Sequence, residues 1–386
     1  MNDYIIPLNK VNGVTSAKAL GNIKYNVNKK VGHTGTLDKF ASGLLIALTG
    51  RYTKLTEEYM NLKKTYLATI EFGKETDTLD PEGSVVAISS KIPDIMEIEW
   101  QFKNKFIGLI EQEPPKYSAL RINGKRASDI MRDGGDADIK KRNVTIYSNE
   151  IISYNYGTLV CRFTVSRGTY IRSIARDLAI ALKSRAYLKD LKREQVGPFT
   201  LNDAVDSSDE ETIKELYSHQ KKDNYVVSIG VFDGIHLGHK RIIEKNIEIA
   251  KRHNLKSLIL TFDKSPKGVE EFLSLDDKLS VIKSFGVDEI KVLEWNDTLK
   301  NKSGASFMLE LLREYNIKKI VTGMDFSVGN MNNPVKLEDL KFFFRPYNVI
   351  IENYVSTEDG AKISSTYIHS LYNSGSVSEA EKLLSR

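Results

Sequence analysis

The pattern of hydrophobic and polar positions divides the chain into two halves of different texture. In the first half, apolar and polar residues alternate over short segments such as 65–70 and 159–165, as in strands with one buried face. Residues 44–48 form a continuous apolar run and are expected to be a buried strand. This half therefore predicts an α+β domain around a mainly antiparallel sheet.

The second half alternates predicted strands with predicted helices. We expect strands at 225–231, 257–262, 289–293 and 319–322, with helices between them at about 238–253, 276–285 and 303–315. Because parallel strands in one sheet need crossover connections, this order predicts an α/β domain with a parallel sheet.

An acidic segment separates the halves. Residues 206–211 are polar and acidic, which favours either a linker or the capped start of a short helix through Leu216. We expect one domain at 1–205, an acidic linker at 206–223 and a second domain at 224–386.

Composition places the chain among soluble globular proteins. Of its 386 residues, 41% are hydrophobic and 28% are charged. The single cysteine, Cys161, excludes an internal disulfide framework and Cys-based zinc sites, and it fits a reducing cytoplasm. No signal peptide is apparent and the apolar runs are too short to span a bilayer, so we expect no membrane contact. No oligomeric state is indicated.

The net charge of +5 is unevenly distributed. Residues 1–205 hold 31 basic and 23 acidic residues, a balance of +8, while 206–220 carry −4 and 221–386 carry +1. A basic first half suits a polyanionic partner, because each Lys or Arg near a phosphate releases a counterion. The alternative is a solvated surface with a modest excess of lysine.

Three residues of the first half suggest a reactive site. Asp38 ends the loop Gly-His-Thr-Gly-Thr-Leu-Asp that begins at Gly32, and it is either a nucleophile or a turn residue. Arg172 follows a glycine turn and could hold a buried carboxylate ionised, or form a structural ion pair. Tyr66 offers a phenol on a strand, where it could stack on a base.

Several segments, taken in chain order, resemble one family. They are Lys10 with 13–16, 32–38 with 41–45, 50–55, 64–66, 72–80 with Gly83, 112–119 with Gly124 and 126–127, 168–173 with Asp177, and 191–193 with 197–199. Together they resemble the catalytic domain of the TruB family, the bacterial tRNA pseudouridine-55 synthases, over residues 1 to about 205. Val11 stands where the family has proline, and we see no RNA-binding domain of the PUA type, which usually follows the catalytic core.

The resemblance implies a mechanism. Asp38 would attack C1′ of the target ribose, or assist loss of uracil, and the free base would rotate and rejoin through C5. Tyr66 would stack on the uracil and is a candidate for removing the C5 proton, while Arg172 would orient Asp38. The reaction needs no cofactor or metal. The target base must be flipped out of the T loop of tRNA, and His33 would fill the vacated stack, unless it is a locally satisfied turn residue.

Recognition would rest on the T arm of tRNA. The residues implied in RNA binding are Lys10, His33, Arg126, Lys141, Arg142, Leu191 and Arg193.

The second half carries a loop suited to phosphate. Residues 230–239 follow a predicted strand and open a helix, whose N-terminus offers unpaired N–H groups to an anion. His236 and His239 lie three positions apart with Gly238 between them, so both can approach a triphosphate. A metal-binding pair is the alternative, but no third ligand lies nearby, and we assign no metal site.

This loop resembles the H-x-G-H nucleotidyltransferases, and specifically the FMN adenylyltransferase module of bacterial FAD synthetases, over residues 224–386. The resemblance implies a Rossmann-like fold and transfer of AMP from Mg-ATP to FMN. The nucleotide-binding residues that it implies are Gly230, Phe232, Asp233, His236, Gly238, His239, Asp325, Ser364, Ser365 and Thr366. Ser327, Tyr367 and His369 depart from the family's arginines, and a neutral side chain lacks the bidentate phosphate grip of arginine.

Three hypotheses cover the whole chain. The first is a pseudouridine synthase fused to an FMN adenylyltransferase. The second is a pseudouridine synthase with a degenerate nucleotide-fold tail that binds RNA or a partner. The third is an RNA chaperone without enzymatic activity, against which the set of Asp38, Tyr66 and Arg172 argues, because a pure binder needs no nucleophile.

Overall fold

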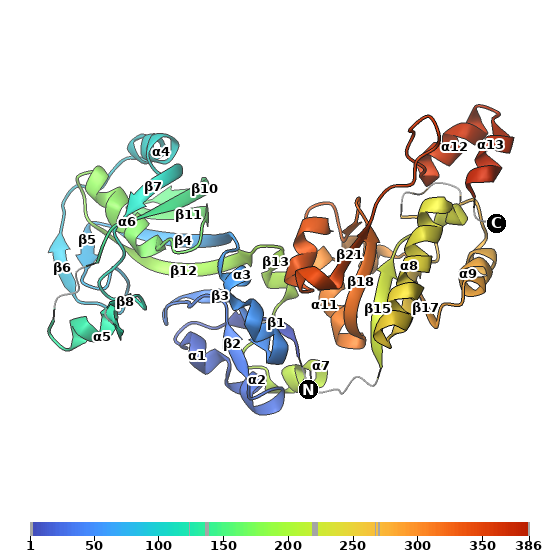
Figure 1. The fold of residues 1–386 in the computed structure, drawn as a ribbon. Helices are drawn as coiled ribbons and strands as arrows, with labels where there is room; N and C mark the ends of the chain where they lie inside the picture. Colours follow the sequence, from blue (N-terminus) through green and yellow to red (C-terminus); the bar gives the residue numbers. More distant parts are fainter. Residues whose placement is uncertain are drawn as a thin grey trace. The chain divides into compact units, whose positions relative to one another are not determined.

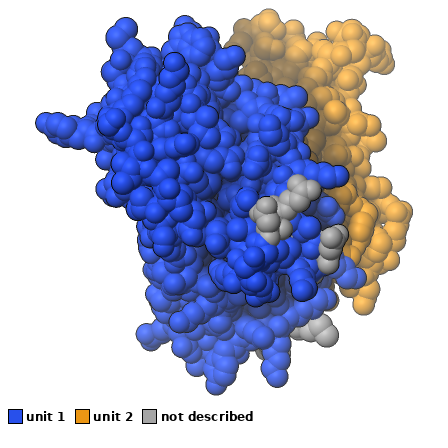
Figure 2. Space-filling view, turned by 90° about the vertical axis from the view of Figure 1, so that its left-hand side faces the viewer, with its two compact units in different colours: residues 1–218 blue, residues 219–386 orange. Residues whose placement is uncertain are grey.

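The chain forms two compact units. The computed structural model describes residues 3–122, 124–135, 139–217, 223–266, 268 and 271–384. Unit 1 comprises residues 1–218 and unit 2 comprises residues 219–386 (Figure 2). None of the helices within these described ranges is both long enough and apolar enough to cross a membrane.

Unit 1 is built around one large, mainly antiparallel sheet (Figure 1). Its main path runs β14 (Val205–Asp206), β1 (Ile5–Lys10), β3 (Ser42–Thr49), β12 (Ala186–Val196), β4 (Lys64–Phe72), β11 (Thr158–Val165), β10 (Arg142–Asn155) and β7 (Gly108–Gln112). Two short strands pair outside this path, β2 (Val31–His33) with β3 and β13 (Phe199–Thr200) with β12. Only the β1–β14 and β3–β12 pairs are parallel among these strands, so the predicted α+β class is confirmed.

One face of this sheet packs against two helices. Every second residue of β4 is buried, as the alternating pattern predicts. The buried face meets α6 (Ile171–Ala181) and α4 (Ile95–Asn104), and the shared core includes Ile70, Phe163, Leu178 and Phe102. Helix α6 begins shortly after the turn at Gly168, and Arg172 is its second residue. Since the core holds α6 in place, it also fixes the position from which the Arg172 side chain extends.

The segment interpreted as a linker folds in part onto unit 1. Strand β14 pairs with β1, and helix α7 (Glu210–Tyr217) buries Ile213 and Tyr217. The Tyr217 ring meets the Tyr4 ring edge-on, with centroids 5.2 Å apart. Residues 218–222 of the predicted linker lie outside the described ranges.

Unit 2 is an α/β domain with a parallel sheet, as the sequence predicts. The strand order is β17 (Glu289–Leu293), β16 (Lys256–Phe262), β15 (Asn224–Ile229), β18 (Asn316–Gly323) and β21 (Val349–Glu352), and all four pairings are parallel. Val226 packs under α8 (Leu237–His253), while its neighbour Val227 points to the opposite face and is also buried. Both faces of the sheet are therefore covered.

Five further α-helices lie in the described part of unit 2 (Figure 1). They are α9 (Leu275–Ser284), α10 (Asp297–Asn301), α11 (Gly304–Glu314), α12 (Ser365–Asn373) and α13 (Val377–Leu383). Helices α12 and α13 pack together around Ile368 and Ala380, and their cluster includes Leu237 at the start of α8. This packing brings the late segment 363–369 to the loop before α8.

Candidate functional sites

Unit 1 contains a cavity of about 500 Å³. Its walls come from the Asp38 loop, β4, β12 and the turn before α6. The lining residues are Gly35, Thr36, Leu37, Asp38, Met60, Lys64, Tyr66, Ala119, Leu120, Arg142, Ser166, Arg167, Gly168, Thr169, Tyr170, Ile171, Arg172, Leu191 and Arg193. The three residues singled out from the sequence as reactive, Asp38, Tyr66 and Arg172, therefore line one cavity.

Arg172 holds the Asp38 carboxylate from one side. The guanidinium Nε lies 2.9 Å from Oδ2, and Nη2 donates a hydrogen bond of 3.1 Å to Oδ1. The Arg172 side chain is 4% exposed and that of Asp38 is 34% exposed. The carboxylate is thus fixed by a buried cation while its free side opens into the cavity.

A second carboxylate, Asp80, extends this contact. Arg172 Nη1 lies 3.2 Å from Asp80 Oδ2, and Asp80 Oδ1 accepts a 2.6 Å hydrogen bond from the Thr78 hydroxyl. Burial raises the pKa of Asp80, against the opposing effects of Thr78 and Arg172. We did not select Asp80 from the sequence, although it lies within the 72–80 segment that carries the resemblance.

Tyr66 and Arg193 form another part of the cavity wall. Tyr66 is 9% exposed and sits on the buried face of β4. The Arg193 guanidinium carbon lies 6.0 Å from the centre of the Tyr66 ring. The phenol ring is therefore packed between the core and a cation at the cavity wall.

Lys10, which the resemblance implies in RNA binding, is buried in unit 1. This residue is 0% exposed, and its ammonium donates to the carbonyl oxygens of Val14 at 2.6 Å and Val11 at 3.1 Å. Burial lowers the pKa of Lys10 to about 8. An ammonium enclosed by these carbonyls favours a structural role for Lys10 in the loop around Val11 and Val14, in place of the RNA contact that the resemblance implies.

The other residues implied in RNA binding fall into two groups. Arg126 and Lys141 are exposed, as phosphate contacts require. Arg142 lines the cavity with its guanidinium 4.9 Å from the centre of the Tyr170 ring. Leu191 and Arg193 are buried and line the cavity wall.

His33 lies on β2, half-buried and outside the cavity lining. Burial lowers the pKa of its imidazole, with a smaller contribution from the charge of Arg193. The buried Nδ1 has no hydrogen-bond partner among the described residues. A neutral ring at this position fits stacking better than phosphate binding.

In unit 2, the two histidines lie at the N-terminus of α8. His236 caps the helix, because its Nδ1 accepts a 3.3 Å hydrogen bond from the His239 backbone N–H. The two rings stack with centroids 3.7 Å apart, and Gly238 leaves room for this stack, since a Cβ there would lie 3.0 Å from the His236 ring. Burial lowers the pKa of His236 to about 4 and that of His239 well below its usual value. Both imidazoles are neutral at pH 7.

Phe232 and Asp233 are both buried in the loop before α8. Phe232 is 1% exposed and packs edge-on against the His239 ring, with the ring centroids 5.3 Å apart. Asp233 is 5% exposed, and its Oδ1 accepts a 2.9 Å hydrogen bond from the Phe272 backbone N–H. These side chains hold the loop in shape, and the nucleotide-binding role that the resemblance implies for both residues stays a prediction.

The segment around Ser364 approaches the same loop. Ser364 caps α12, Ser365 donates to the Asp233 carbonyl at 3.3 Å, and Thr366 is exposed in the first turn. The His369 ring stacks on Phe272 at 3.9 Å, and its Nε2 lies 3.7 Å from Asp233 Oδ2.

One cation near His236 was not recognised from the sequence. Lys362 pairs with Asp325 at 2.8 Å, and both charges affect the pKa of His236. Ser327, Tyr367 and His369 depart from the family's arginines, whereas Lys362 supplies a positive charge near His236 that depends on the contact between residues 325 and 362.

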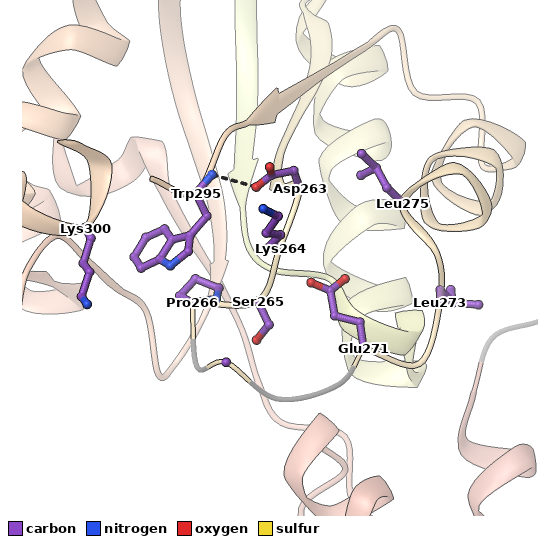
Figure 3. A pocket seen from close by; sticks show the side chains of 10 residues that line it. Asp263, Lys264, Ser265, Pro266, Glu271, Leu273, Leu275, Trp295 and Lys300 are labelled. Carbon is purple, nitrogen blue, oxygen red and sulfur yellow. Dashed lines mark hydrogen bonds between the residues drawn. The ribbon is translucent and has the colours of Figure 1, made fainter. Parts of the chain in front are cut away.

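Unit 2 contains a hollow of about 680 Å³ beside Asp263, which directly follows β16 (Figure 3). Trp295, Pro266, Lys264 and Lys300 contribute to its lining. The Trp295 backbone N–H donates a 2.7 Å hydrogen bond to Asp263, which fixes the indole beside the hollow. Within the described ranges, no group of three or more His, Cys, Asp or Glu residues is arranged to hold a metal ion.

Comparisons with known proteins agree with the division into two units. Residues 23–171 match the family model described as TruB family pseudouridylate synthase (N terminal domain), and residues 218–367 match the model described as FAD synthetase. The tRNA pseudouridine synthase B of Borreliella burgdorferi (strain ZS7) is 46% identical over 209 residues, which are 53% of this chain and 73% of that protein.

Other relatives are similar over the same extent. The tRNA pseudouridine synthase B of Rickettsia bellii (strain OSU 85-389) is 41% identical over 208 residues, covering 53% of this chain and 71% of that protein. Among solved structures, a Cbf5-Nop10-Gar1 complex contains a chain that is 26% identical, with a TM-score of 0.41, matching 53% of this chain and 52% of that one.

Proposed function

The chain belongs to the TruB family, and from that premise we propose that unit 1 isomerises uridine-55 in the T loop of tRNA to pseudouridine. The observation that carries the proposal is the Asp38 carboxylate, which opens into a cavity and is held by the buried Arg172. The relatives that are 46% and 41% identical bear the name tRNA pseudouridine synthase B.

The arrangement of the cavity supports a covalent or ion-pair mechanism. Arg172 contacts both oxygens of the Asp38 carboxylate and so orients its exposed side towards the space where C1′ of a flipped ribose would lie. Tyr66 offers its ring to the uracil and is the candidate for accepting the C5 proton. These steps use side chains of unit 1 and call for no cofactor.

For the RNA, we propose contacts by the exposed Arg126 and Lys141 and by Arg142 at the cavity, with His33 filling the stack that the flipped base leaves. The excess of positive charge in residues 1–205 supports binding of a phosphate backbone. Incubating the protein with a tRNA transcript and mapping pseudouridine by position tests the proposal; modification at another position would contradict the assignment to uridine-55.

For unit 2 we propose binding of Mg-ATP and FMN, with transfer of AMP to FMN as its reaction. The N-terminus of α8, capped by His236 and followed by His239, supports a phosphate site, and Lys362 adds a cation beside it. The hollow beside Trp295 suits a planar ring, with Lys264 and Lys300 available for a phosphate (Figure 3).

The competing function for unit 2 is a nucleotide fold that binds RNA or a partner without catalysis. Tyr367 and His369 favour it, because neither offers the bidentate phosphate contact of an arginine, and the His369 ring is stacked on Phe272. Incubation with FMN and labelled ATP separates the two functions. Formation of FAD supports the transferase, and its absence at high enzyme concentration supports the non-catalytic module.

A further inference from the structure

Arg193 is a buried cation at the wall of the cavity that holds Asp38 and Tyr66. It is 1% exposed, and β12 carries it directly beside β3, where its Cα partner is Gly43. A Cβ at Gly43 would lie 2.4 Å from the Arg193 carbonyl oxygen, so the two backbones approach as closely as only glycine permits. This close approach of the two strands fixes the backbone position from which the Arg193 side chain extends.

Two backbone carbonyls hold the guanidinium itself. Nε donates a 2.6 Å hydrogen bond to the Leu44 carbonyl, and Nη2 donates a 3.1 Å hydrogen bond to the Gly35 carbonyl in the Asp38 loop. Nη1 lies 3.6 Å from the position of a Cβ at Gly35, which also lines the cavity. None of the described residues accepts a hydrogen bond from Nη1, so this donor remains for a molecule in the cavity.

The charge of Arg193 has no carboxylate beside it. Arg172 is paired with both Asp38 and Asp80, whereas no Asp or Glu among the described residues lies within ion-pair distance of Arg193. The charge of Arg193 affects a neighbouring group. The pKa of Lys64 is lowered to about 7, mainly by burial and secondly by the positive charge of Arg193. A buried cation without a counter-charge costs folding free energy, and such groups are concentrated at functional sites.

The proposed isomerisation creates the missing negative charge. When the N1–C1′ bond breaks, its electron pair leaves with the base, while C1′ is bonded to, or paired with, the Asp38 carboxylate. The uracil anion spreads its charge over N1 and the carbonyl oxygens O2 and O4. When C5 then bonds to C1′, Asp38 is released, and the proton lost from C5 is balanced by one gained at N1.

We propose that Arg193 is a catalytic residue that stabilises the detached uracil anion, with Nη1 donating to a carbonyl oxygen of the base. This inference rests on the proposed function of unit 1. A donor fixed before the reaction stabilises developing charge without reorganising, which is the most effective form of electrostatic catalysis. Its burial in the wall, above the Tyr66 ring, sets this role apart from a contact with the RNA backbone.

The test compares Arg193→Gln with a matched control, Lys192→Gln. Lys192 is exposed on the opposite side of the same strand, so the control removes the same charge outside the cavity. Single-turnover rates are measured with tRNA containing either uridine or 5-fluorouridine at the target position. Fluorine at C5 stabilises the departing anion, and consumption of either nucleoside is followed by chromatography after digestion of the RNA.

We expect Arg193→Gln to slow the reaction of uridine by about 10²–10³-fold, with unchanged tRNA affinity. The loss of rate should be several-fold smaller for 5-fluorouridine, because its anion needs less help, and Lys192→Gln should behave as wild type with both substrates. The ratio between the rate loss with uridine and the rate loss with 5-fluorouridine does not depend on the fraction of folded variant, because a smaller folded fraction lowers both rates equally. If Arg193→Gln does not fold, Arg193→Lys is compared in the same way.

Equal losses for the two substrates, or a loss explained by weaker tRNA binding, would overturn the role of Arg193 and leave the proposed function standing. A wild-type protein that converts neither substrate overturns the proposed function and this inference with it. The two failures are therefore distinct.

Discussion

The Arg172 guanidinium lies against the Asp38 carboxylate, with Nε 2.9 Å from Oδ2, although 134 residues separate the two along the chain. The same guanidinium also donates to the carbonyl oxygens of Thr78 at 2.8 Å and Tyr117 at 3.1 Å. A planar group held at several points cannot rotate, so Arg172 presents a fixed edge to Asp38. The reactive geometry depends on what surrounds the arginine as much as on the carboxylate.

Replacing Asp80 with asparagine should weaken that geometry. Asp80 is buried and pairs with Nη1 of Arg172, whereas Asp38 pairs with Nε and Nη2. Asp80→Asn therefore removes one of the two negative charges beside the guanidinium. We expect kcat for pseudouridine formation to fall with unchanged tRNA affinity, and the free energy of unfolding to fall by about 2 kcal/mol. Steady-state kinetics and urea unfolding measure the two effects.

Asp77→Asn is the matched control for this prediction. Asp77 lies in the same turn and accepts a 2.9 Å hydrogen bond from the Ser84 backbone N–H, but it is exposed and makes no contact with Arg172. The prediction is wrong if both variants lose the same fraction of kcat, because the effect would then come from the turn as a whole.

Lys10 and Lys141 should respond differently to substitution. Lys10→Met removes a buried donor, and we expect the free energy of unfolding to drop by about 2 kcal/mol, with no change in the salt dependence of tRNA binding. Lys141→Met removes an exposed charge and should reduce the slope of log K against log salt by roughly 0.8. Filter binding over a range of salt concentrations distinguishes them; a reduced slope for Lys10→Met would contradict its structural role.

Unit 2 should lose stability as the pH falls from about 6.5 towards about 4. Burial lowers the pKa of native His236 to about 4, whereas the unfolded side chain titrates near 6.5. Between these values the unfolded state binds the additional proton, so stability rises with pH across the window and is lost on acidification. For His236 alone the change amounts to about 3 kcal/mol.

Tryptophan fluorescence can follow this transition in the full chain. The protein contains two tryptophans, and Trp100→Phe leaves Trp295 as the reporter of unit 2. His236→Asn keeps a helix cap without a titrating ring and should flatten the pH dependence, whereas His253→Gln, at the exposed end of the same helix, should not. Parallel curves for the wild type and His236→Asn would refute the prediction.

Both domain folds could be predicted from local patterns. The alternation of apolar and polar residues in β4 matches the alternation of buried and half-buried side chains in the structure. In unit 2, the order of apolar strand and helix segments in the sequence likewise matches the order of elements in the fold. The association of Asp38 with Arg172 came from a family resemblance, because no periodicity links residues 134 positions apart.

Burial of charged residues was the main feature that the sequence did not reveal. Lys10 and Arg193 are of residue types that commonly bind phosphate. Both are nevertheless buried, on the strands β1 and β12 that flank β3. Asp80 and Lys362 meet their charged partners, Arg172 and Asp325, only after distant segments come together. In each case a long-range strand or helix contact decides the environment, and a single sequence does not encode that contact in any local pattern.

The central claim is that Asp38 is the nucleophile of unit 1, and a single-turnover assay of Asp38→Asn with a tRNA transcript tests it most directly. The variant keeps the size of the side chain and can still accept a hydrogen bond from Arg172. We predict that it forms no pseudouridine while it binds tRNA nearly as well as the wild type. Formation of pseudouridine by Asp38→Asn under these conditions would contradict the account.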